Sequence, residues 1–326
     1  MDHTPYDKTS GDHSLPTHPH WTDEQEQLIT APYTYLASVG GKNLRSQLIS
    51  LFNGVLQIPS DKLAQISKII EMLHTASLLI DDIEDGSTLR RGKPSAHLVY
   101  GTPYVINSSN YMYFLSLQET LALGNTDCIR AFNEELLNLH RGQSLDLYWR
   151  DNLIIPPETQ YFEMVMNKTG GLFRLAVRMM ECFSEVDVVS LVPLSNILGI
   201  IYQVKDDYLN LQGETLQKNK GFCEDISEGK LSFPIIHSLR STTTDNSNLL
   251  DILKLKTEDD KIKHTAIEIL KSTQSFEYTL NMLNLLKTKA HDWVSEAQAK
   301  CTNSGLDELN DNLKPFHTAI DTLSQV

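Results

Sequence analysis

The sequence predicts an all-α protein, and proline placement, helical periodicity and the near absence of strand patterns all favour this fold class. Proline costs a helix interior about 3 kcal/mol, yet residues 60–93, 104–155, 158–192 and 235–314 contain none. These stretches have the lengths of long helices or helical hairpins. Runs that alternate polar and β-branched residues, as strands do, are essentially absent. Neither a fixed-period repeat nor a Gly/Ser-rich linker divides the chain after residue 30, so a single helical bundle is expected.

The first segment of the chain is predicted to be a disordered tail. Residues 1–20 contain three prolines, four histidines and almost no apolar side chains, so ordering them would not offset the lost entropy. The irregular spacing of His3, His13, His18 and His20 favours a solvated tail over a metal site. Residues 21–326 are predicted to form the folded domain.

The first proline-free stretch carries a helical stripe. Its apolar residues recur at intervals of three, four and seven positions, which places them on one helix face: Leu63, Ile66, Ile69, Ile70, Leu73, Ile80 and Ile83. The three later stretches are predicted to form helices or helical hairpins of the same bundle, because they too are long and free of proline.

The composition argues against several classes of function. The 326 residues hold 28 Lys and Arg against 42 Asp and Glu, a net charge of −14, whereas a nucleic-acid binder needs surplus cations. Mean hydropathy is −0.26, and no apolar run approaches the ~20 residues of a transmembrane helix. The N-terminus shows no secretory pattern, and the spacing of the four cysteines fits neither a zinc knuckle nor a dense disulfide framework. We therefore expect a cytoplasmic protein with reduced thiols.

The end of the striped helix carries the first group of residues that indicates chemistry. Asp81, Asp82 and Asp85 lie within about one turn, so three carboxylates converge there. Like charges repel at this spacing, and the dipole at a helix C-terminus opposes them further. The arrangement calls for a cation, and oxygen ligands with room for water suit Mg²⁺. A solvated acidic turn is the alternative.

A second acidic pair weakens that alternative. Asp206 and Asp207 also follow an apolar helical stretch, and Asn210 offers a further oxygen four positions after Asp206. Two acidic helix ends that are more than a hundred residues apart can face each other across a bundle and hold several divalent ions between them.

Basic residues accompany both acidic groups. They lie beside the acids, at a helix start that follows a glycine pair, or further along the chain: Lys42, Arg45, Arg90, Arg91, Lys168, Lys220 and Lys230. In an acidic chain, this concentration predicts an anionic substrate that is bound through both metal and cations, such as a phosphate or diphosphate ester. The G-x-x-x-x-G-K-[ST] loop is absent, which counts against a P-loop NTPase.

These motifs resemble those of the trans-isoprenyl diphosphate synthases, specifically the fungal-type geranylgeranyl diphosphate synthases. The resemblance covers roughly residues 30–320 and rests on motifs that agree in order and spacing: Gly40-Gly41-Lys42-x-x-Arg45, His74, Asp81-Asp82-x-x-Asp85 with Arg90-Arg91-Gly92, Gly142-Gln143-x-x-Asp146, Lys168-Thr169, Gln203-x-x-Asp206-Asp207 and Lys220 through Lys230. Asn210 departs from the third Asp of many farnesyl diphosphate synthases. The resemblance implies a helical bundle of the isoprenoid synthase type with a central cavity, and a homodimer.

The resemblance also implies an activity and roles for single residues. Isopentenyl diphosphate would condense head to tail with dimethylallyl, geranyl or farnesyl diphosphate, with three Mg²⁺ ions, to give a twenty-carbon diphosphate. The metal would be held by Asp81, Asp85, Asp206 and Asn210, with Asp82 and Asp207 close by. The allylic diphosphate would be bound by Arg90, Lys168, Lys220 and Lys230, and isopentenyl diphosphate by Lys42, Arg45, His74 and Arg91. The carbocation would be stabilised by the oxygen dipoles of Thr169 and Gln203.

Product length is predicted from small residues about one turn before Asp81. In the family, aromatic residues at this depth cap the pocket at fifteen carbons, so Ala76 and Ser77 would leave room for another isoprene unit. A deeper floor would come from Tyr113, Phe114 and His140, which resemble the bulky residues of the twenty-carbon fungal enzymes. Plain core packing is the alternative for the two aromatic residues.

Other functions stay open at this point. A synthase of a fifteen- or twenty-five-carbon product would carry the same motifs. A class I terpene cyclase shares the fold, but it would leave Lys42, Arg45 and Arg91 unexplained, and its N-D-x-x-[ST]-x-x-x-E run is absent. A non-catalytic partner subunit would be expected to lose acids from one motif, and both motifs are present.

Overall fold

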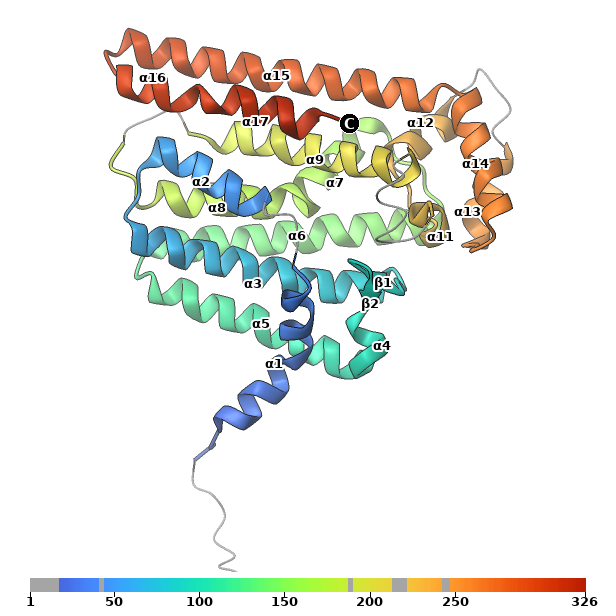
Figure 1. Cartoon of the computed structure of the whole chain (residues 1–326), viewed down its shortest axis with the longest axis horizontal. Coiled ribbons are helices and arrows are strands. Elements are labelled where there is room, and N and C mark those ends of the chain that lie inside the picture. The colour runs from blue at the N-terminus through green and yellow to red at the C-terminus, as the bar shows by residue number, and fades with distance from the viewer. Residues whose placement is uncertain (1–17, 41–43, 187–189, 213–221, 242–246) are drawn as a thin grey trace, which may run out of the picture.

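The computed structural model describes residues 18–40, 44–186, 190–212, 222–241 and 247–326, and these are almost entirely helical. Long helices run side by side along the bundle, and short helices gather at one end of it (Figure 1). The elements are α1 (Asp23–Ser38), α2 (Leu44–Leu56), α3 (Ser60–Glu84), β1 (Leu89–Arg90), β2 (Lys93–Pro94), α4 (Ala96–Tyr100), α5 (Thr102–Ala122), α6 (Thr126–Asn152), α7 (Glu158–Lys168), α8 (Gly170–Glu181), α9 (Val192–Gln212), α11 (Glu224–Glu228), α12 (Phe233–Arg240), α13 (Ser247–Leu255), α14 (Asp260–Ser272), α15 (Ser275–Asn303), α16 (Asp307–Leu313) and α17 (Pro315–Ser324). The predicted all-α fold class is therefore confirmed.

Proline lies mostly at the start of helices. Pro103, Pro234 and Pro315 occupy the first turn of α5, α12 and α17, while Pro59 and Pro157 directly precede α3 and α7. The missing N–H group does no harm there, because the first amides of a helix have no intrahelical partner. The proline-free stretch 235–314 contains α13–α16 rather than one hairpin, because positions such as Lys256 and Gln274 adopt positive φ and end the preceding helices.

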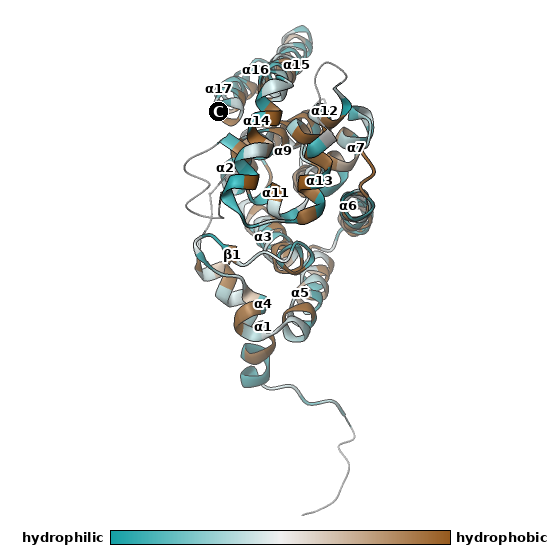
Figure 2. Ribbon diagram, turned by 90° about the vertical axis from the view of Figure 1, so that its right-hand side faces the viewer, coloured by the Kyte–Doolittle hydropathy of each residue, from teal (hydrophilic) through white to brown (hydrophobic). Residues whose placement is uncertain are grey.

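Helix α3 forms the centre of the core. Ile66, Ile69, Ile70 and Leu73 of the predicted stripe are each at most 2% exposed, and burying each such side chain stabilises the fold by about 1.5–3 kcal/mol. The helix packs against α5 and α8, and apolar segments face one another inside the bundle (Figure 2). In the described part of the chain, α3 alone has the length and hydropathy of a membrane span, but its apolar face is used in this core.

A two-stranded hairpin follows α3, and it was not predicted from the sequence. Strands β1 and β2 are antiparallel and pair Leu89 with Pro94 and Arg90 with Lys93. The two loop residues, Arg91 and Gly92, both have positive φ, as a tight two-residue hairpin turn requires. Strands of two residues are too short to show the alternation by which strands are recognised.

Two glycines allow helices to cross closely. A Cβ at Gly142 on α6 would lie 2.4 Å from the Lys168 backbone nitrogen, and one at Gly199 on α9 would lie 2.9 Å from the Gly170 Cα. Such distances are shorter than any real Cβ contact, so only glycine fits. The two crossings fix the end of α7 against α6 and the start of α8 against α9.

The predictions for the tail and the thiols are only partly covered by the structure. Residues 1–17 of the predicted tail lie outside the described residues, so the boundary at residue 20 stays a prediction. The four cysteines are free, and Cys128, Cys223 and Cys301 are buried, in agreement with the expectation of reduced thiols.

Two histidines join the last helix, α17, to α15. His291 Nδ1 and His317 Nδ1 lie 2.7 Å apart, so they share a proton. The other ring nitrogens contact Asp321, which also pairs with Lys287, and Gln298. Burial and the neighbouring His291 lower the pKa of His317, because a second proton would place two N–H groups face to face.

We expect the protein to lose stability as the pH falls below about 6.5, the ordinary pKa of histidine. Since the folded pKa of His317 is lowered, the folded chain binds fewer protons than the unfolded chain. This contribution to stability is thus complete above that pH and is lost as the pH falls toward the lowered pKa. His317→Gln cannot titrate, so its melting temperature should fall less than that of the wild type between about pH 7 and pH 5. Equal falls would refute this role.

Candidate functional site

The first acidic group lies where α3 ends. The Asp85 N–H donates to the Asp81 carbonyl, so these two residues lie on one face, as predicted. Their side chains are 25% and 14% exposed, whereas that of Asp82 is only 1% exposed. Burial, together with repulsion from Asp81, raises the pKa of Asp85 to about 6. A carboxylate that resists ionisation beside a second carboxylate has the property of a site that needs a cation.

Arginine side chains hold two of these carboxylates. Arg90 Nε donates to Asp82 Oδ1 at 2.6 Å, and its guanidinium also lies 3.4 Å from Asp81 Oδ2. Arg150 Nη1 donates to Asp85 Oδ1 at 2.6 Å. Arg90 was predicted to bind a diphosphate, and the structure directs it first to Asp82.

Helices α6 and α7 supply further polar groups to this end of α3. Lys168 Nζ lies 2.6 Å from Asp146 Oδ2 and 3.7 Å from Asp81 Oδ1. Although burial opposes its charge, Asp146, Asp81 and Asp85 raise the pKa of Lys168, so it stays a cation. Gln143 Nε2 donates to Glu84 at 2.6 Å and approaches Asp81 at 3.4 Å.

The two residues of the second acidic pair, Asp206 and Asp207, have different environments. Asp207 is 1% exposed and accepts hydrogen bonds from Tyr161, the Phe233 N–H, Gln203 and Lys230. Asp206 is half-buried, and among the described residues nothing donates a hydrogen bond to its carboxylate. Asp207 therefore anchors α9, and the ligand-binding role predicted for Asp206 stays a prediction.

Asn210 has a partner of its own. It is buried, and its Oδ1 accepts the Asp225 N–H at 3.1 Å, which ties α9 to the start of α11. The role of metal ligand predicted for Asn210 stays untested, but this bond engages the oxygen on which that role depends.

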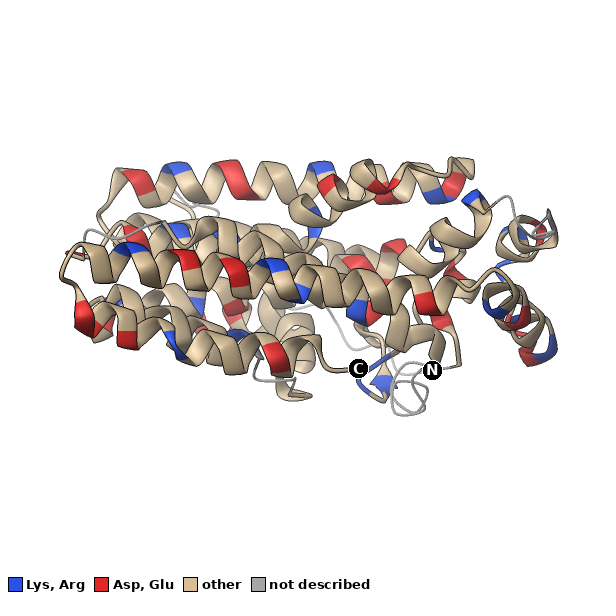
Figure 3. Cartoon of the chain, turned by 90° about the horizontal axis from the view of Figure 1, so that it is seen from above, with Lys and Arg blue, Asp and Glu red and all other residues tan. Residues whose placement is uncertain are grey.

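The structure brings the two acidic helix ends together through α11. Ser87, which follows α3, donates to Glu228 at 3.4 Å, and Lys230 contacts Asp207 on α9. Burial and the nearby Asp85 raise the pKa of Glu228 well above its ordinary value. In the view of Figure 3, acidic and basic residues are interspersed along the helices of the bundle. At this end of the bundle, Glu228 lies near Asp85, and Lys230 pairs with Asp207.

A second, cationic group lies between α2, α3 and the hairpin. Among the described residues, the buried Arg45 Nε and His74 Nε2 have no hydrogen-bond partner, and Arg91 donates to the Gly40 carbonyl. Burial, then Arg45, Arg91 and Arg90, lower the pKa of His74 well below its ordinary value. Buried polar atoms without partners cost about 1–3 kcal/mol each, so this group fits an anion. Lys42 and Lys220, predicted for the same purpose, lie outside the described residues.

Thr169 and Gln203 meet at the start of α8 and the middle of α9. The Thr169 hydroxyl donates to Gln203 Oε1, while Gln203 Nε2 donates to Asp207 Oδ1 at 2.8 Å. These bonds fix the orientation of the amide, and among the described residues no donor reaches the Thr169 hydroxyl oxygen. Both residues lie beside the second acidic pair, and the role predicted for them stays a prediction.

The predicted chain-length residues do not all face the interior. Ala76 is fully buried beside Met112, Ser77 is half-buried, and burial together with Glu84 and Asp81 raises the pKa of Tyr113. Phe114, however, is 72% exposed. Consecutive helical residues point about 100° apart, so only Tyr113 can face inward, and the prediction that Phe114 lines the floor of this chain is wrong.

His140 lies at the surface and touches the pocket residues from outside. Its ring centroid is 5.8 Å from that of Tyr113, and its Nδ1 lies 2.8 Å from the Leu136 carbonyl. It can support Tyr113 from behind but does not itself close the floor.

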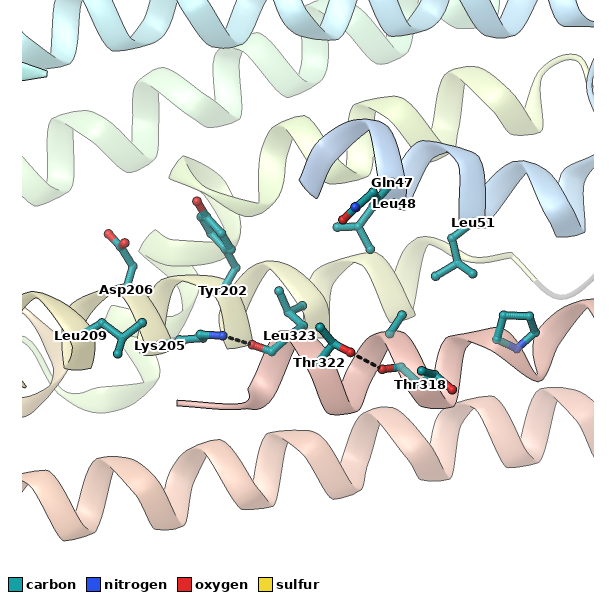
Figure 4. A pocket seen from close by; sticks show the side chains of 12 residues that line it. Gln47, Leu48, Leu51, Tyr202, Lys205, Asp206, Leu209, Thr318, Thr322 and Leu323 are labelled. Atoms are coloured by element: carbon teal, nitrogen blue, oxygen red, sulfur yellow. Dashed lines mark hydrogen bonds between the residues drawn. The ribbon is translucent and has the colours of Figure 1, made fainter. Parts of the chain in front are cut away.

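A cavity of about 910 Å³ lies between α2, α9 and α17. Its walls include Leu48, Tyr202, Asp206 and Leu323, and Tyr202 and Asp206 extend from α9 to the side away from α17 (Figure 4). Lys205 turns the other way and donates to the Leu323 carbonyl at 3.0 Å. Asp206 of the second acidic pair thus lies at the edge of a largely apolar space.

Sequence reasoning missed several residues of this site. Arg150 and Tyr161, which hold Asp85 and Asp207, had no motif to mark them. A signal for Arg150 exists, because Gln143, Asp146 and Arg150 recur at three and four positions on α6 and thus share a helix face.

The fold and the site define a class of protein: an all-helical protein that gathers carboxylates, arginines and lysines at one end of its bundle. The polyprenyl synthetase family model matches residues 26–270. The chain is 52% identical over 279 residues to the geranylgeranyl pyrophosphate synthase dpmpD of Macrophomina phaseolina (strain MS6), covering 86% of each chain. It is 50% identical over 285 residues to the geranylgeranyl pyrophosphate synthase olcC of Penicillium canescens, covering 87% of this chain and 85% of the relative.

A further relative is much longer. The chain is 51% identical over 274 residues to the copalyl diphosphate synthase of Talaromyces verruculosus, a match that covers 84% of this chain but only 28% of that protein. The chain belongs to the polyprenyl synthetase family and is a prenyltransferase.

Proposed function

We propose that the protein is a Mg²⁺-dependent geranylgeranyl pyrophosphate synthase that condenses isopentenyl diphosphate with dimethylallyl, geranyl or farnesyl diphosphate. The observation that supports this proposal is the presence of two polar groups of different character. One combines carboxylates with cations, and the other is a cationic group in which buried nitrogens of Arg45 and His74 have no hydrogen-bond partner among the described residues. A reaction between two diphosphate substrates needs both.

The chemistry of three carboxylates supports magnesium, although among the described residues no three acidic, histidine or cysteine side chains are gathered closely enough to hold a metal ion. Asp81, Asp85 and Asp206 are half-buried carboxylates, and burial together with repulsion from Asp81 raises the pKa of Asp85. Such a set suits a hard cation that keeps some of its water. Bound there, Mg²⁺ would neutralise charge on the allylic diphosphate as it leaves. We propose three Mg²⁺ ions, as in the family. Asn210 would be a weaker metal ligand, because its side-chain oxygen already accepts the hydrogen bond that holds α11.

The protein side chains would divide the two diphosphates between them. Lys168 and Lys230, which keep their protons beside the acids, would hold the allylic diphosphate, with Arg90 and Lys220. The isopentenyl diphosphate would fill the second site, where Arg45, His74, Arg91 and Lys42 would bind it.

Other groups would orient the reaction. The oxygen dipoles of Thr169 and Gln203 would stabilise positive charge on the allylic carbon. Asp207 would fix Gln203 and Lys230 through its hydrogen bonds. Asp82 would hold Arg90 in place. The departing diphosphate would accept the proton.

The proposal is tested by supplying Mg²⁺, isopentenyl diphosphate and a radiolabelled allylic primer, and then separating the products. A synthase gives an elongated diphosphate, and the predicted chain length is twenty carbons. A cyclic hydrocarbon would indicate a cyclase, and no product would indicate an inactive subunit. A product that stops at fifteen carbons or extends to twenty-five would correct the chain length alone.

Ser77→Phe is expected to shift the main product from twenty to fifteen carbons. Ser77 is half-buried one turn before Asp81, so a phenyl ring there would occupy the space of the last isoprene unit. Product chain length with geranyl or farnesyl diphosphate as primer measures the effect, with Ser77→Thr as a small-residue control. An unchanged profile would contradict the pocket model.

We also propose that the protein is a homodimer. Large apolar side chains are exposed along one side of α5 and of the neighbouring α6, at helical spacing: Ile106, Phe114, Leu121, Leu137, Leu145 and Tyr148. An apolar surface of this kind favours a partner with the same surface. Phe114 would then lie in the dimer interface, although it does not line the floor of the product pocket in its own chain. The predicted cytoplasmic location remains part of the proposal.

Phe114→Glu is therefore expected to convert the dimer to a monomer in size-exclusion chromatography with light scattering. A charge at this 72% exposed position is harmless in a monomer but costly in a buried interface. Leu255→Glu on α13, where Leu255 is 62% exposed, serves as the control and should leave the mass unchanged. A Phe114→Glu variant of unchanged mass would exclude this surface as the interface.

A further inference from the structure

Arg150 of α6 makes three hydrogen bonds, two of which join it to the end of α3. Its side chain is 8% exposed. Nη1 donates to Asp85 Oδ1 at 2.6 Å, Nη2 to the Glu84 carbonyl at 3.0 Å, and Nε to Asp151 Oδ1 at 3.1 Å. Only the planar fork of a guanidinium can serve three acceptors in these directions, because lysine carries its donors on a single nitrogen.

The position of Asp85 makes its negative charge unfavourable without a cationic partner. It follows the last residue of α3, where carbonyl groups lack intrahelical partners and the helix dipole repels a carboxylate. Asp81 repels it as well. Arg150 satisfies the Glu84 carbonyl and binds one carboxylate oxygen, Oδ1, and in the described part of the chain no donor occupies Oδ2.

Two effects of Arg150 on a metal ion at Asp85 oppose each other. Its positive charge, close to the carboxylate, disfavours a second cation through Coulomb repulsion. Its geometry holds the carboxylate in one orientation, with Oδ2 free to bind, and groups that orient a ligand in this way typically change metal affinity by about 10–100-fold. If charge were the main effect, removing Arg150 would tighten metal binding.

We propose that Arg150 is a positioning residue for Asp85, and that orientation outweighs repulsion. The proposal rests on the proposed function, since it assigns Asp85 a metal ion. Arg150 itself touches neither substrate, and it acts only through the carboxylate that it holds.

The test compares Arg150→Lys and Arg150→Met in the full chain. Binding of Mn²⁺ in the presence of inorganic pyrophosphate is measured by electron paramagnetic resonance, and the Mg²⁺ concentration for half-maximal condensation is measured separately. We expect both variants to bind Mn²⁺ about tenfold more weakly and to need correspondingly more Mg²⁺. The KM for isopentenyl diphosphate should stay within about twofold, because Arg45, His74 and Arg91 are untouched.

Two further variants serve as an independent test and as a control. Asp151→Asn keeps Arg150 but removes the charge of one partner, so it should weaken Mn²⁺ binding slightly even if the Arg150 variants fold poorly. Arg130→Met breaks an exposed pair with Asp127 near the start of the same helix, and it should change nothing.

The outcomes separate the two proposals. Unchanged Mn²⁺ affinity in Arg150→Lys, or tighter binding in Arg150→Met, would overturn the positioning role. If the wild type makes no prenyl product but Mn²⁺ binding with pyrophosphate still depends on Arg150, the positioning role holds and the proposed function fails.

Discussion

Asp81→Asn is expected to lower kcat/KM by a factor on the order of 10³, the loss found when a preorganised electrostatic group is removed from an active site. Asp81 is the residue at which the first acidic group meets Lys168 and Gln143. Asparagine keeps the size of the side chain and one oxygen but removes the charge that a metal ion would need.

The loss should have a particular form. The Mg²⁺ concentration for half-maximal rate should rise, the KM for isopentenyl diphosphate should change little, and chelation of Mg²⁺ should abolish wild-type activity. Asp127→Asn, which removes an exposed carboxylate on α6, is the matched control and should leave the rate unchanged. If Asp81→Asn kept a tenth of the activity or more, the first acidic group would not be the metal site.

Gly142→Ala is expected to reduce both stability and activity. Its Cβ would lie 2.4 Å from the Lys168 backbone nitrogen and 2.9 Å from the Met164 carbonyl oxygen, and backbone atoms cannot move aside as a flexible side chain can. Overpacking of this kind costs about 1–3 kcal/mol. Moving α7 also moves Lys168 from Asp81 and Asp146, and a shift of about 1 Å can lower a rate by about 10²-fold.

Gly54→Ala provides the control for this prediction. Gly54 lies inside α2, and a Cβ there would meet nothing within 4 Å. The substitution should therefore stabilise the protein by up to about 1 kcal/mol, the difference in helix propensity. Thermal unfolding and kcat/KM are measured for the wild type, Gly142→Ala and Gly54→Ala. A Gly142→Ala variant as active and stable as the wild type would contradict the close crossing of α6 and α7.

Helical periodicity and proline placement predicted the parts of the fold that depend on residues close together in the chain. The Ile66–Leu73 stripe and the proline-free stretches indicated α3 and its long neighbours, because helical periodicity and the missing N–H of proline act within a few residues. The positions of Asp81 and Asp85 on one face followed from the same periodicity. The β1–β2 hairpin is too short to carry any pattern.

Side-chain contacts that depend on the packing of helices far apart in the chain could not be predicted from the sequence. Arg150 and Asp85 are 65 positions apart, and nothing local indicates that they meet. Phe114 and Tyr113 are neighbouring aromatic residues, so only their direction on α5 shows that Tyr113 faces inward. Asn210 offers the oxygen that a metal ligand needs, and the sequence did not indicate that this oxygen also accepts the Asp225 N–H.

The central claim is that one chain holds two diphosphates, only one of them through metal. Isothermal titration with farnesyl thiodiphosphate, which reacts slowly, and isopentenyl diphosphate measures this directly. The account predicts that both ligands bind together in Mg²⁺, and that a chelator abolishes binding of the allylic analogue but spares isopentenyl diphosphate at Arg45, His74 and Arg91. Binding of only one diphosphate per chain, or equal loss of both ligands without Mg²⁺, would contradict it.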